Sequence, residues 1–67
     1  MITMAEVIDR CFRKELTLTM NECREVFMIW DKITDLQMEW ETWRGKTKHS
    51  LHIKSLNVYF DIVEDEK

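Results

Sequence analysis

One segment of the chain, residues 19–45, carries all three tryptophans and the clearest marks of a helix start and a helix stop. Thr19 is followed by Glu22 at the spacing of a capping box, in which the threonine hydroxyl and the glutamate satisfy free amides at a helix N-terminus. Gly45, the only glycine in the chain, suits the left-handed position that closes a helix. No proline or glycine lies between them, so we expect a long second helix over about 20–44.

The apolar residues of this segment change face partway along. They form two successive stripes with helical spacing, first Met20, Cys23, Val26, Phe27 and Trp30, then Ile29, Ile33, Leu36, Trp40 and Trp43. Thr34 lies where the stripes exchange and is followed by Gln37 in another box-like pair. This pair is typical of a kink or a fresh helix start near Thr34, but the interpretation we favour is an ordinary threonine within an unbroken helix.

The second half of the segment also fits a strand. Its residues alternate in polarity, with apolar Leu36, Met38 and Trp40 interleaved with polar Gln37, Glu39 and Glu41. Periodicity alone leaves open whether residues 35–44 are helix or strand. We favour the helix because the helical spacing extends further and Gly45 is placed as a stop.

A first helix is predicted over about 4–15. Thr3 and Glu6 form another capping box immediately before an amphipathic pattern. Because residues 16–18 form a short connection, the first two helices are expected to lie together as a helical hairpin. A DNA-reading helix-turn-helix is disfavoured, since carboxylates such as Glu22 at the start of the second helix would face phosphates.

The residues after Gly45 alternate in polarity, which predicts a β-hairpin over about 47–63 with a turn at 54–57. The register follows from that turn and places Ile53 opposite Val58 and Leu51 opposite Phe60. Two strands alone are barely stable, so we expect their apolar face to pack on the helices.

The expected fold class is therefore α+β, with an N-terminal helical hairpin followed by a C-terminal β-hairpin. We expect one domain over residues 1–67, ending in an acidic tail at 64–67. A chain of 67 residues buries a small core, so its stability alone would be marginal and self-association is a reasonable expectation.

Composition narrows the classes of function. A formal net charge of −3 disfavours a domain whose main task is binding nucleic-acid phosphates. The N-terminal residues lack the charged and apolar regions of a signal peptide, and no apolar run is long enough to span a bilayer. We expect a cytoplasmic protein without a membrane partner, with both cysteines reduced.

Neither catalysis nor metal binding is indicated. The candidate soft-metal ligands are Cys11, Cys23, His49 and His52. The two cysteines are too far apart for a zinc knuckle, and strand geometry would direct the two histidines to opposite faces. No nucleophile or phosphate-binding motif is present. We expect a non-enzymatic protein that holds no metal and no cofactor.

The tryptophans indicate a contact surface, because burying all three inside so short a chain is difficult. The predicted docking surface is Ile33, Leu36, Trp40 and Trp43, with Glu39 and Glu41 as a polar rim. Tryptophan is enriched among the residues that dominate binding energy. We expect an inhibitor or adaptor that binds another protein or a second copy of itself. The alternative is that the C-terminal hairpin simply covers this stripe.

A competing hypothesis is a small nucleic-acid-binding regulator. The candidate contacts are Arg44, Lys46, Lys48, His52 and Lys54, with His49 between them. Trp43 or Tyr59 would offer a surface on which bases stack. The simpler interpretation is that Lys46 and Lys48 balance a helix end and the acidic tail.

Overall fold

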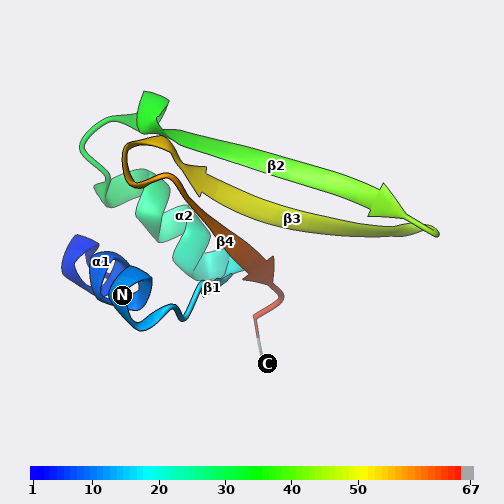
Figure 1. The fold of residues 1–67 in the computed structure, drawn as a ribbon, viewed down its shortest axis with the longest axis horizontal. Helices are drawn as coiled ribbons and strands as arrows, with labels where there is room; N and C mark the ends of the chain where they lie inside the picture. Colours follow the sequence, from blue (N-terminus) through cyan, green and yellow to red (C-terminus); the bar gives the residue numbers. More distant parts are fainter. Residues whose placement is uncertain (66–67) are drawn as a thin grey trace.

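The computed structural model describes residues 1–65. The elements in chain order are helix α1 (Met4–Arg13), strand β1 (Thr17–Thr19), helix α2 (Met20–Ile29), the 3₁₀ turn η1 (Ile33–Asp35), strands β2 (Leu36–Trp43) and β3 (Lys46–Ile53), the 3₁₀ turn η2 (Lys54–Leu56) and strand β4 (Val58–Val63). The four strands form one mixed sheet in the order β1-β4-β3-β2 (Figure 1). The α+β class is confirmed.

Both helices begin at the positions that Thr3 and Thr19 predicted for their N-termini. The hydroxyl of Thr3 accepts a hydrogen bond from the amide of Glu6 at 3.2 Å, and α1 ends at Lys14 in the left-handed conformation. Thr19 and Glu22 form the complete capping box, with the Thr19 hydroxyl accepting from the Glu22 amide and a Glu22 oxygen accepting from the Thr19 amide. These local signals fix the two helix starts.

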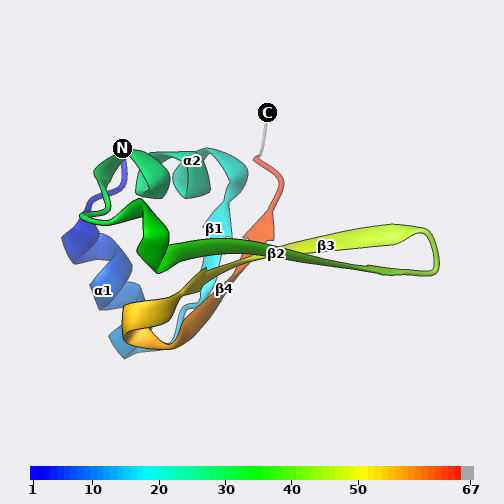
Figure 2. The same cartoon turned by 90° about the horizontal axis from the view of Figure 1, so that it is seen from above.

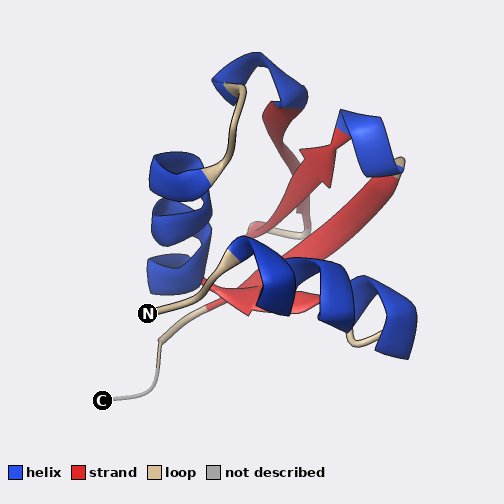
Figure 3. Cartoon of the chain, turned by 90° about the vertical axis from the view of Figure 1, so that its left-hand side faces the viewer, coloured by secondary structure: helices blue, strands red, loops and turns tan. Residues whose placement is uncertain are grey.

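The predicted helical hairpin is wrong. The connection between the helices contains β1, which pairs in parallel with β4 and places Leu18 opposite Ile62. Leu18 is fully buried, and β1 forms an edge strand of the sheet. The two helices consequently run in clearly different directions (Figure 3). A bidentate ion pair from Arg10 to Glu22, at 2.7 and 3.1 Å, joins them.

The long second helix over 20–44 is also wrong, because α2 ends at Ile29. Trp30 is already extended, with φ −71° and ψ 140°. The indole N–H of Trp30 donates to Asp35 Oδ2 at 2.8 Å, while the amide and hydroxyl of Ser55 donate to Asp35 at 2.7 and 2.6 Å. The chain forms neither an unbroken nor a kinked helix at Thr34, because Asp35 holds a turn that separates α2 from β2.

The strand alternative for the second half of that segment is confirmed. Strand β2 pairs antiparallel with β3 over its whole length, from Leu36 opposite Ile53 to Trp43 opposite Lys46. Gly45 ends no helix; with Arg44 it forms a two-residue hairpin turn, in which both residues have positive φ of 77° and 51°. That is the backbone of a type I′ turn, and its twist matches the flanking strands.

The register predicted for the C-terminal hairpin is confirmed. Strand β3 pairs antiparallel with β4, with Leu51 opposite Phe60 and Ile53 opposite Val58. Asn57 takes the left-handed conformation that closes the connecting turn, with φ 52°. Since β4 also pairs with β1, the two C-terminal strands form the centre of the sheet.

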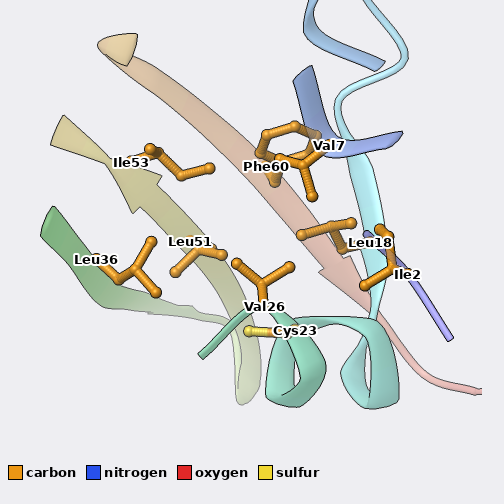
Figure 4. Close-up of a cluster of buried hydrophobic side chains, with 9 residues drawn as sticks. All are labelled: Ile2, Val7, Leu18, Cys23, Val26, Leu36, Leu51, Ile53 and Phe60. Carbon is orange, nitrogen blue, oxygen red and sulfur yellow. The ribbon is translucent and has the colours of Figure 1, made fainter. Parts of the chain in front are cut away.

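The core lies between the two helices and one face of the sheet, which we call the helix-side face (Figure 4). Its buried residues are Ile2, Val7, Leu18, Cys23, Val26, Leu36, Leu51, Ile53 and Phe60. The opposite face, which we call the open face, carries the alternate residues of each strand, and no helix within residues 1–65 covers it. None of the helices in this described range is long and apolar enough to cross a membrane.

Candidate functional site

The far end of the β2–β3 hairpin, residues 40–49, extends beyond both helices, and we call it the arm (Figures 1 and 2). Every residue from 40 to 48 is exposed. Strand pairing nevertheless continues to the turn, where Thr42 lies opposite Thr47 with their hydroxyls 3.3 Å apart. The arm is therefore an ordered hairpin that the core does not cover.

Two tryptophans project from the arm, one on each face. Trp40 has the same strand parity as buried Leu36, which places it on the helix-side face, whereas Trp43 has the opposite parity and lies on the open face. The exposed fractions of Trp40 and Trp43 are 69% and 72%. The guanidinium of Arg44 lies 5.7 Å from the centre of the Trp43 ring, a cation–π contact at the turn.

The structure divides the predicted docking surface. Leu36 is buried in the core, and Ile33 lies in η1 at the opposite end of β2 from the turn. The helical spacing that joined these residues to the tryptophans does not apply, because alternation in a strand puts Trp40 and Trp43 on opposite faces. Of the predicted apolar residues, Trp40 and Trp43 lie exposed on the arm, one on each face, and exposed Ile33 lies apart from them at the other end of β2.

Glu39 and Glu41 are alternate residues of β2 on the open face; Glu41 lies in the arm and Glu39 immediately precedes it. A Glu39 oxygen lies 3.7 Å from Nδ1 of His52 on β3, and Glu41 lies opposite Lys48. Lys48 itself forms an ion pair with Asp61 at 3.5 Å. The open face therefore carries both signs of charge.

The basic residues of the nucleic-acid hypothesis are dispersed along β3. Arg44 and Lys46 lie at the turn, whereas Lys54 lies in η2 at the other end of the strand. His52 stacks face to face on Tyr59, with ring centres 4.1 Å apart. Eight strand residues separate the two ends, roughly 26 Å at 3.3 Å per residue. These side chains do not form one patch.

A groove that the sequence did not indicate lies between α2 and β2. Its volume is about 330 Å³, and it is lined by Met20, Cys23, Arg24, Phe27, Met28 and Met38. Met28 is 77% exposed, and Met38 precedes Trp40 on the helix-side face. The sequence did not indicate this groove, because one long helix over 20–44 would place Met38 far from the other lining residues.

A larger groove of about 530 Å³ lies where η1, η2 and the start of α1 meet. Trp30 and Asp35 both line it. The hydrogen bonds from Trp30 and Ser55 occupy both carboxylate oxygens of Asp35. Through these hydrogen bonds Asp35 holds the turn between α2 and β2.

The candidate metal ligands do not come together. Within residues 1–65, no three His, Cys, Asp or Glu side chains form a group that could hold a metal ion. Strand parity puts His49 and His52 on opposite faces of β3. Burial raises the pKa of both the Cys11 and Cys23 thiols, which favours the protonated form.

Comparison of the chain with protein-family models, with curated protein sequences and with solved structures found no match. Its function must therefore be inferred from its own residues and their arrangement.

Proposed function

We propose that this protein is a small binding module, acting as an inhibitor or adaptor, that recognises another protein through the arm. The observation that carries the proposal is the exposure of Trp40 and Trp43, 69% and 72%, on a paired hairpin beyond the core. A rigid indole removes a large area from water at a small cost in side-chain entropy, so exposed tryptophans are unfavourable for a free monomer and effective in an interface.

The arm supports a particular mode of binding. Trp40 and Trp43 lie on opposite faces, so a partner that receives the arm in a cleft contacts one indole on each wall. Because the Arg44–Gly45 turn and the β2–β3 pairing already order the hairpin, little conformational entropy is lost on binding. Such a module acts by occupying its partner's surface.

The test is partner capture from the cells that make the protein. The variants are Trp40→Ala and Trp43→Ala, and the matched control is Phe12→Ala, since Phe12 is an aromatic residue of α1 that is 82% exposed. A partner retained by wild type and Phe12→Ala and lost by either tryptophan variant supports the proposal. Equal retention by all four proteins contradicts it. Sedimentation of the purified protein shows whether that partner is a second copy.

Nucleic-acid binding through the turn is the competing proposal. Trp43, Arg44 and Lys46 lie together there and favour it, whereas Glu39, Glu41 and Asp61 on the open face oppose it. Binding to single-stranded or duplex DNA that weakens steeply with salt and is lost in Arg44→Ala with Lys46→Ala would favour this alternative.

A further inference from the structure

Strand β2 forms an edge of the sheet. Within residues 1–65 it pairs only with β3, so the backbone groups on its other side have no strand partner. At eight residues it is much longer than β1, the three-residue strand at the opposite edge. A long edge strand is a ready template for a further strand.

The groove beside this edge determines which side chains an added strand can bury. Among the residues that line the groove, Met38 of β2 comes from the sheet and the others come from α2. The groove therefore lies between α2 and the edge strand. A strand added to β2 places every second side chain on the helix-side face, next to Met38, Trp40 and the groove. Those positions favour apolar residues.

The other face of β2 carries charge. Glu39 and Glu41 are alternate residues on the open face, and in the described chain neither carboxylate lies within ion-pair distance of a lysine or arginine. Opposite charges that face each other across neighbouring strands are stabilising, and like charges are destabilising. The alternate positions of an added strand therefore favour lysine or arginine.

A second copy of the chain does not meet this requirement. In antiparallel pairing of β2 with β2 of another copy, residues directly opposite share a face. At the registers with the longest overlap, Glu39 then lies opposite Glu39 or Glu41 of the second copy. The facing carboxylates repel each other and disfavour self-pairing through this edge.

We infer that β2 accepts an extended segment of a different protein as a fifth strand, with apolar side chains towards the α2–β2 groove and basic side chains opposite Glu39 and Glu41. This inference deepens the proposed function and rests on it, because it specifies the chemistry of the partner segment that binds along β2, from Met38 beside the core to the arm. Backbone hydrogen bonds hold the segment, and the two alternating sets of side chains select it.

The probe is a synthetic peptide that alternates lysine with valine over about eight residues, the length of β2 and within the usual range for a strand. One matched control replaces lysine with glutamate. Another keeps the side chains and carries N-methyl groups on every backbone amide, which removes the hydrogen-bond donors on both edges. Binding is measured by calorimetric titration, and amide hydrogen exchange reports where the probe lies.

The expected result is binding of the lysine peptide that slows exchange in residues 36–43, at least about tenfold weaker binding of the glutamate peptide, and none by the N-methylated peptide. The double variant Glu39→Lys, Glu41→Lys should reverse the preference between lysine and glutamate. Equal binding of the N-methylated peptide, or an unchanged preference in the double variant, overturns strand addition.

The two proposals fail separately. If no peptide binds while Trp40→Ala still abolishes partner capture, the added strand is refuted and recognition by the arm stands. If the lysine peptide binds β2 with the expected preferences while both tryptophan variants still capture the partner, the strand site stands and the role of the indoles is refuted.

Discussion

The sulfur atoms of Cys23 and Met38 lie 3.5 Å apart, so α2 touches β2 at the point where the hairpin leaves the core. Cys23 is buried and Met38 is half-buried, whereas Trp40, two residues further along the same face, is 69% exposed. The boundary between the core and the arm therefore lies between Met38 and Trp40.

This boundary predicts different stability costs at neighbouring positions of one strand face. Met38→Ala should lower the free energy of unfolding by about 1–2 kcal/mol, because it removes a half-buried side chain that contacts α2. Trp40→Ala should change it by no more than about 0.5 kcal/mol, as expected for a surface position. Urea unfolding of both variants measures the difference. A larger cost at Trp40 would place the indole in the core and remove it from the docking surface.

Substitutions at Arg44 and Gly45 should change the stability of the turn of the arm, because both residues have positive φ. Gly45→Val should destabilise the turn by about 1–2 kcal/mol, because a β-branched residue resists the left-handed conformation of Gly45. An added Cβ would meet no atom within 4 Å, so the cost comes from the backbone conformation and not from a clash at the Cβ. Arg44→Asn should stabilise the turn, since Asn-Gly is the preferred type I′ pair. Amide exchange of residues 40–49 measures both effects. Faster exchange in Arg44→Asn would contradict the assigned turn.

Glu22 connects the two helices and should make stability depend on pH. Glu22→Ala removes both the Arg10 ion pair and half of the capping box, for an expected loss of about 2–3 kcal/mol, whereas Thr19→Ala removes the cap alone and should cost about 1 kcal/mol. Denaturant unfolding of both variants compares these losses, and equal losses would show that the ion pair contributes nothing.

The sign of the pH effect follows from the pKa of Glu22. The hydrogen bond from Arg10 holds that pKa below its ordinary value. The stabilisation is therefore fully present above the ordinary glutamate pKa and is lost as the pH falls through the lowered, folded-state pKa. Unfolding midpoints measured across this acidic range should fall more for wild type than for Glu22→Ala.

Asp35 should control the environment of Trp30. Its hydrogen bonds from Ser55 and then from the Trp30 indole lower the pKa of the carboxyl, so the carboxylate form stabilises the fold and its contribution disappears as the pH falls through the folded-state pKa. Asp35→Ala should loosen the turn before β2 and move Trp30 emission to longer wavelength. The measurement uses protein with Trp40→Phe and Trp43→Phe, and an unchanged spectrum would contradict this role for Asp35.

Local signals in the sequence identified the parts of the fold that depend on near neighbours. Thr3 and Thr19 marked both helix starts because a cap bonds to residues within one turn. Alternation after Gly45 gave the Leu51–Phe60 register because a short turn fixes which strand residues face each other.

The prediction from sequence was wrong over residues 30–44. Helical spacing continued through this segment, and residues 36–41 also satisfied strand alternation. The deciding interaction is pairing with β3, which the local pattern does not contain. The same error affected the candidate site. It grouped buried Leu36 with exposed Trp43, and it hid the groove that forms only when α2 and β2 are separate elements.

The measurement that tests recognition by the arm most directly is amide hydrogen exchange of the protein alone and in complex with its captured partner. Binding should slow exchange across residues 36–50 and leave α1 unchanged, because the arm and the edge of β2 become covered. Slowed exchange confined to residues 4–13, with the arm exchanging as it does in the free protein, would contradict the account.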